Sequence, residues 1–154
     1  MTRLQTALTF ALAALLSFAV SAPALANSNI GFRTGLALSP DMFIAGIHFR
    51  TNPLNENLYF VPSVEGGVGD ATMVAGNADL QYQFKTKSKL RPYAGGGLTL
   101  NWFHDDGEDE TDVGGSILGG ISLGETSFGN MFLEGKLGLG NVPDVKIVVG
   151  WNLR

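Results

Sequence analysis

The chain has 154 residues, a formal net charge of −4 and no cysteine, and it is 45% hydrophobic but only 16% charged. A chain of this length fits one domain. The missing cysteine excludes disulfide bonds, thiolate metal sites and cysteine nucleophiles. Nucleic-acid binding requires a basic face, which this acidic composition does not indicate, so we expect no nucleic-acid partner.

The first 26 residues are typical of a secretory signal peptide. Arg3 is the only charge before Arg33, and residues 4–20 are apolar and rich in Ala and Leu. Small residues ending in Ala24-Leu25-Ala26 follow, as at a signal-peptidase site. The competing interpretation is a membrane anchor, for which the apolar stretch is short. We therefore expect export, cleavage after Ala26 and one domain at residues 27–154.

Apolar residues alternate with polar or small ones through the rest of the chain, which is typical of strands with two different faces. Turn residues separate eight such segments, namely 30–38, 42–50, 58–68, 74–84, 90–102, 113–123, 131–139 and 145–154. Their lengths are close to the 9–11 residues that a tilted membrane strand needs. Pro62 interrupts the third segment, and because proline cannot donate to a ladder we expect a bulge or a displaced strand start there.

The polar face of these segments is rich in glycine, which weakens water-exposed strands but suits a narrow barrel lumen. Its charges have both signs, and inside a barrel they would form a paired network, as buried charges require. The expected luminal charge network consists of Arg33, Arg50, Glu65, Asp79, Arg91, Glu134, Lys136 and Lys146. The alternative is a set of scattered surface charges.

The aromatic residues concentrate toward the ends of the expected strands. One group would lie near the end that carries the N-terminus: Phe32, Phe49, Phe60, Tyr82, Phe84 and Trp151. Phe43 and Trp102 would lie near the other end. This distribution is similar to the aromatic girdles of membrane barrels, although β-propensity alone also enriches strands in aromatic residues.

These patterns together predict an all-β fold: a closed, antiparallel, up-and-down, transmembrane β-barrel of about eight strands, with the apolar face outward. A barrel of this size leaves an interior just wide enough for side chains, so we expect no open pore. The alternative is a soluble periplasmic barrel that binds an apolar ligand in its core.

The segment Arg91-Pro92-Tyr93-Ala94-Gly95-Gly96-Gly97-Leu98 and the alternating final strand resemble the small outer-membrane β-barrel family, which includes outer membrane proteins A and X and the opacity-type surface proteins. The resemblance covers residues 27–154. It implies a place in the bacterial outer membrane, contact with outer-membrane lipids and lipopolysaccharide, and insertion by the barrel assembly machinery. That machinery reads the final strand, which in the family usually ends on an aromatic residue, whereas this chain ends Trp151-Asn152-Leu153-Arg154.

Six of the 14 acidic residues lie in one short run. They are Asp105, Asp106, Glu108, Asp109, Glu110 and Asp112. We expect residues 103–112 to form an exposed acidic loop that contacts cations, lipid headgroups or a partner. The alternative is a solvated loop without a ligand. The spacing does not match a calcium loop, and we predict no metal site and no cofactor.

We predict a monomeric, non-enzymatic barrel with a structural or surface-interaction role and no catalytic residues. The family nevertheless includes lipid-modifying enzymes. An enzyme of that kind would need a base and a nucleophile within reach of each other. His48 would be the base here, with Ser63 and Glu65 on the polar face of the neighbouring strand. A hydrogen-bonded luminal histidine is the favoured interpretation of His48.

Overall fold

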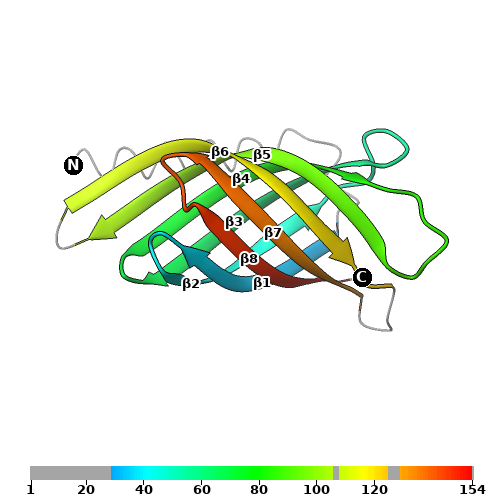
Figure 1. The fold of residues 1–154 in the computed structure, drawn as a ribbon, viewed down its shortest axis with the longest axis horizontal. Coiled ribbons are helices and arrows are strands. Elements are labelled where there is room, and N and C mark those ends of the chain that lie inside the picture. The colour runs from blue at the N-terminus through cyan, green and yellow to red at the C-terminus, as the bar shows by residue number, and fades with distance from the viewer. Residues whose placement is uncertain (1–28, 106–107, 125–128, 154) are drawn as a thin grey trace.

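The computed structural model describes residues 29–105, 108–124 and 129–153, and the predicted signal peptide lies outside them. This part of the chain forms a closed barrel of eight antiparallel strands (Figure 1). The strands are β1 (Asn29–Leu38), β2 (Met42–Arg50), β3 (Leu58–Gly69), β4 (Thr72–Gln83), β5 (Arg91–Asp105), β6 (Glu108–Ser122), β7 (Asn130–Gly140) and β8 (Val145–Asn152).

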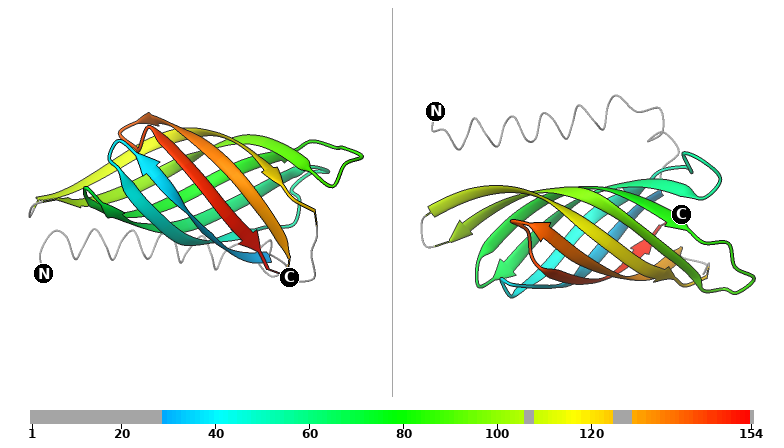
Figure 2. Two further views of the ribbon diagram at one scale, coloured as in Figure 1. Left: turned by 60° about the horizontal axis from the view of Figure 1, so that its bottom comes forward. Right: turned by 45° about the horizontal axis from the view of Figure 1, so that its top comes forward.

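Each strand pairs with its neighbour in sequence, and β1 pairs with β8 from Gly31↔Asn152 to Leu38↔Val145 to close the barrel. The strands are tilted across the barrel axis (Figure 2). The predicted fold class is therefore confirmed, and most strand ends agree with the sequence pattern within one or two residues. The described residues include no helix long and apolar enough to cross a membrane.

The connections differ between the two ends of the barrel. At the end where β1 begins and β8 ends, called the terminal end here, they span residues 51–57, 84–90 and 123–129. At the opposite end, called the hairpin end, they span only residues 39–41, 70–71, 106–107 and 141–144. The longer connections therefore all belong to the terminal end.

The prediction of a loop at residues 103–112 is wrong, because most of these residues belong to the two strands of a hairpin. β5 continues to Asp105 and β6 starts at Glu108, with His104 opposite Asp109. The hairpin projects beyond the neighbouring strands at the hairpin end (Figures 1 and 2). A run of charged residues indicates exposure to water, but exposed residues can still form the backbone hydrogen bonds of a ladder. The acidic run therefore predicts exposure here and does not by itself predict a loop.

Pro62 also differs from expectation, because β3 contains it without a bulge. The β3–β4 register runs unbroken through Pro62↔Ala78. On the other side, the β2–β3 ladder stops at His48↔Ser63, just before the proline. A backbone hydrogen bond from Thr51 to Phe60, 3.1 Å long, then continues the same register. The missing N–H of Pro62 thus costs one local interruption and shifts no strand.

The two faces of the barrel wall are divided as the sequence predicts. Large apolar side chains of every strand are exposed on the outside, with Leu98 at 68% and Val113 at 69%. The side chains buried in the lumen are largely polar or charged, including Arg33, Glu65 and Lys136. The alternative of a soluble barrel with an apolar ligand in its core requires the opposite arrangement.

The luminal glycines provide space for large side chains on the neighbouring strand. Gly31 lies opposite His48, Gly97 opposite Asp79 and Gly120 opposite Tyr93. A Cβ atom at Gly97 would lie 2.1 Å from Asp79 Oδ1, and one at Gly120 would lie 2.5 Å from the Tyr93 ring. The small residues on the polar face are therefore required by the packing of a narrow lumen.

Candidate functional site

The centre of the lumen holds a charge network of three cations and three anions. Its members are Arg33, Lys136, Lys146, Glu65, Asp79 and Glu134. Every one of these side chains is at most 5% exposed. The formal charges of the six residues cancel, which limits the cost of burying them.

Ion pairs join strands that are far apart in the sequence. Glu65 on β3 forms ion pairs with two cations, one on each carboxylate oxygen. Its Oε1 lies 3.1 Å from Arg33 Nη1 of β1, and its Oε2 lies 3.0 Å from Lys146 Nζ of β8. Lys136 of β7 pairs with Asp79 of β4 across the lumen. Arg33 Nη1 also lies 3.8 Å from Glu134 Oε1. The network therefore connects opposite sides of the barrel.

Neutral polar groups extend this network. The Tyr93 hydroxyl and the Gln81 amide donate to Glu134 Oε2 at 2.9 and 3.0 Å. Asn77 donates to the Ser63 hydroxyl at 3.1 Å and accepts a 2.8 Å hydrogen bond from Thr99. These contacts occupy the middle of the lumen with hydrogen-bonded side chains.

A cluster of apolar residues closes the lumen toward the hairpin end, and sequence reasoning did not identify this cluster. They are Ala37, Met42, Ile44, Met73, Ala75 and Val148. Phe103 packs against this cluster. The signal that could have identified them is the occasional apolar residue on the polar face of β2, β4 and β8.

Arg50 and Arg91 are corrections, because both lie apart from the network. Arg50 Nη2 donates to Gln83 Oε1 at 3.1 Å, and its guanidinium carbon lies 4.0 Å from the centre of the Tyr59 ring. Arg91 is exposed. Both are terminal residues of their strands, so alternation gives their face correctly but not their height along the barrel. Arg50 lines the pocket at the terminal end of the lumen, and Arg91 lies exposed at the rim.

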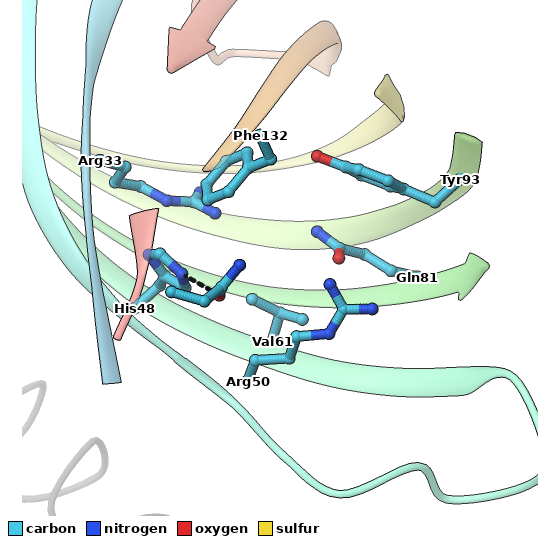
Figure 3. A pocket seen from close by; sticks show the side chains of 8 residues that line it. Arg33, His48, Arg50, Val61, Gln81, Tyr93 and Phe132 are labelled. Atoms are coloured by element: carbon cyan, nitrogen blue, oxygen red, sulfur yellow. Dashed lines mark hydrogen bonds between the residues drawn. The ribbon is translucent and has the colours of Figure 1, made fainter. Parts of the chain in front are cut away.

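His48 does not form the pair that the enzymatic alternative needs. Its Nε2 atom and Asn152 Oδ1 are 2.8 Å apart, and its ring meets Phe132 edge-on with centroids 5.3 Å apart (Figure 3). Ser63 lies opposite His48 in the ladder, but its hydroxyl accepts hydrogen bonds from Asn77 and Arg33. His48 and Asn152 line a small pocket at the terminal end of the lumen, together with Arg33 and Arg50 (Figure 3).

The acidic run occupies the projecting hairpin. Glu110 is exposed, and Asp112 Oδ1 accepts a 3.2 Å hydrogen bond from Asn141 Nδ2. Asp105, Glu108 and Asp109 belong to the strands, and Asp106 lies outside the described residues. Within the described part, no three His, Asp or Glu side chains are grouped so that they could hold a metal ion.

The hairpin end of the barrel is acidic and the β4–β5 connection at the terminal end is basic, a separation that sequence reasoning missed. Residues 39–41, 70–71, 105–112 and 141–144, at the hairpin end, include nine acids and no Lys or Arg. At the terminal end, residues 84–91 carry Lys85, Lys87, Lys89 and Arg91 and no acid. The alternating cations in this segment were the available signal.

A closed eight-stranded barrel with an apolar outer wall and a charged, filled lumen is the architecture of small transmembrane β-barrels, a class known from outer membranes. Two solved structures of that class, both outer-membrane barrels, share the fold. Neisserial surface protein A (NspA) is 19% identical, with 82% of this chain and 94% of that chain covered and a TM-score of 0.61. The N-terminal β-barrel domain of Pseudomonas aeruginosa OprF is 16% identical, with 80% and 93% covered and a TM-score of 0.65. The chain matches no protein-family model and no curated protein sequence.

Proposed function

We propose that this chain is a bacterial outer-membrane barrel with a structural or surface-interaction role and no open pore. The outward apolar wall, formed by all eight strands around a charged lumen, carries this proposal. Such a wall would be an extended apolar surface prone to aggregation in water, whereas the acyl chains of lipids solvate it. The fold shared with two outer-membrane barrels supports the same location. β8 is then the strand that the barrel assembly machinery reads.

The terminal end faces the periplasm in this proposal. An exported chain reaches the outer membrane from the periplasm, so this orientation leaves both ends of the barrel domain on the side of entry. Only the hairpins then have to cross the lipid, and they are short. The projecting β5–β6 hairpin consequently lies at the cell surface, where its acids meet divalent cations, lipopolysaccharide headgroups or a partner.

Membrane fractionation tests the location. Outer membranes from expressing cells are washed with carbonate, and the detergent extract is run on a gel with and without boiling. We expect the protein to resist the wash and to change mobility on boiling, as a closed barrel does. Release into the wash without a mobility shift would contradict the proposal and favour a soluble barrel.

The surface role is tested on the hairpin. A variant with Glu110→Gln and Asp112→Asn, together with the amide equivalents of the other four acids of the run, removes its charge. We expect unchanged heat-modifiable mobility and reduced retention of Ca²⁺ or Mg²⁺ at the cell surface. The wild-type chain with the divalent ions chelated is the control. Failure of the variant to form a barrel would show that the acids serve folding instead.

The absence of an open pore is tested by conductance. The luminal ion pairs and the apolar cluster toward the hairpin end fill the described lumen. We expect the reconstituted barrel to leave a planar bilayer without stable conductance steps. Uniform steps from the wild-type protein would overturn this part of the proposal.

A further inference from the structure

The connection between β4 and β5 presents three cations that have no acidic partner within the described part of the chain. Lys87, Lys89 and Arg91 are exposed, and none forms an ion pair with a described residue. These three residues are called the basic rim here. The adjacent Lys85 differs, because its Nζ lies 2.8 Å from Glu56 Oε2 of the β2–β3 connection. The basic rim therefore carries positive charge that no acid in residues 29–105, 108–124 or 129–153 pairs with.

Hydrogen bonds give this connection a defined shape. The Thr86 hydroxyl donates to Leu90 O at 2.9 Å and accepts from Ser88 N at 3.2 Å. Ser88 Oγ accepts from Leu90 N at 3.1 Å. At its base, Phe84 N donates to Pro92 O at 3.0 Å, which extends the β4–β5 ladder. The lysines thus extend from an ordered turn, which lowers the entropy lost when they bind.

An apolar collar lies directly next to the basic rim. Tyr82, Phe84 and Leu90 are 46–48% exposed, and the Tyr82 and Phe84 rings meet edge-on with centroids 5.4 Å apart. Ile121 of the neighbouring β6 and Leu123, just past the end of that strand, are also exposed. Along the barrel axis, the apolar collar is followed by the cations at the point where the strands end. A lipid leaflet has the same order, because its acyl chains are followed by its phosphates.

We propose that the basic rim binds the phosphate headgroups of anionic phospholipids in the periplasmic leaflet. The inference rests on the proposed membrane location and orientation. Continuity with the apolar collar favours a lipid over a water-soluble polyanion, because one lipid molecule contacts both surfaces. Cations close to an anionic leaflet each contribute about 1 kcal/mol, or about fivefold in affinity.

Lipid retention tests the proposal directly. The full-length barrel is reconstituted into nanodiscs with equal amounts of phosphatidylglycerol and phosphatidylcholine, and the lipids that stay bound on release are counted by native mass spectrometry. The test variant is K87Q/K89Q/R91Q. The matched control is K85Q, which removes a neighbouring cation that Glu56 already neutralises. Insertion of every variant is checked by its heat-modifiable mobility.

We expect the wild type to retain phosphatidylglycerol selectively, the triple variant to lose at least tenfold of that selectivity, and K85Q to stay within about twofold of the wild type. Equal selectivity in the wild type and the triple variant would overturn the inference while leaving the membrane location intact. Failure of the wild type to insert would overturn both. Binding of inorganic phosphate to the rim of the detergent-extracted wild type, without selective retention of phosphatidylglycerol in nanodiscs, would assign the rim to a soluble anion and would also overturn the inference.

Discussion

At the scale of single residues, the lumen is organised by pairs of one glycine and one large side chain. Gly97 leaves space for Asp79, Gly120 for Tyr93 and Gly31 for His48. The sequence shows that glycine is frequent on the polar face, but it does not show which large residue each glycine faces. That assignment depends on the register between strands, which alternation within one strand does not determine.

We predict that Gly97→Ala destabilises the barrel by about 1–3 kcal/mol, as overpacking does. The new methyl group would overlap Asp79 Oδ1 and the backbone of Ala78. Gly119→Ala is the matched control, because a Cβ there would meet its nearest atom at 3.9 Å on the outer face. Urea unfolding in lipid vesicles, followed by tryptophan fluorescence, measures both. Equal stability of the two variants would contradict the steric argument.

The ion pairs lead to a second prediction at this scale. Asp79→Asn leaves Lys136 as a buried cation without its partner, and we expect a loss of about 3–5 kcal/mol in the free energy of unfolding. The double variant Asp79→Leu/Lys136→Met removes both charges and is expected to recover most of this loss. Glu56→Gln, in the exposed pair with Lys85, is the control and is expected to cost at most about 1 kcal/mol. A double variant as unstable as Asp79→Asn would disprove the pairing argument.

His48 supports a third residue-scale prediction. Its ring nitrogen contacts Asn152, and the Ser63 hydroxyl accepts hydrogen bonds from Asn77 and Arg33, so His48 and Ser63 do not form a base–nucleophile pair. We expect His48→Asn to leave the lipid composition of the outer membrane unchanged, as measured by mass spectrometry of extracted lipids. Loss of a modified lipid species in this variant would revive the enzymatic alternative.

At the scale of elements, the strands were readable because the period-two pattern is strong where one side of a strand meets an apolar environment. The β5–β6 hairpin was misread because its acids lie beyond that environment, where alternation of apolar and polar residues is no longer required. Arg91 was misplaced for a related reason, since alternation gives the face of a residue but not its height along the barrel. Predicting which luminal residues form ion pairs requires both the register between strands and the height of each residue along the barrel, and alternation gives neither.

The outer wall supports a prediction at the element scale. Leu98 is the central residue of β5 and is 68% exposed, so Leu98→Arg would place a cation near the middle of the lipid layer. We expect a cost of about 2–4 kcal/mol in vesicles. Leu54→Arg is the control, because Leu54 is 55% exposed but lies in the β2–β3 connection outside the wall. If both variants unfold at the wild-type urea concentration, the wall does not face lipid.

At the scale of the whole molecule, charge is sorted along the barrel axis. The hairpin end is acidic, the luminal network is balanced, and the connection between β4 and β5 at the terminal end is basic. Composition alone reported a modest net charge of −4, which hides this separation because opposite ends offset each other. The topology was needed to assign each charged segment to an end.

The projecting hairpin has a consequence for how copies of the molecule meet. The β6–β7 ladder ends at Gly114↔Gly140, so residues 108–113 of β6 continue without a β7 partner. A strand edge of this kind is a template on which another chain can add a strand, and the usual outcome is aggregation. Here Glu108, Asp109, Glu110 and Asp112 lie along that edge. Two copies approaching edge to edge would bring like charges together, and this repulsion would oppose the joining of two barrels into a shared sheet.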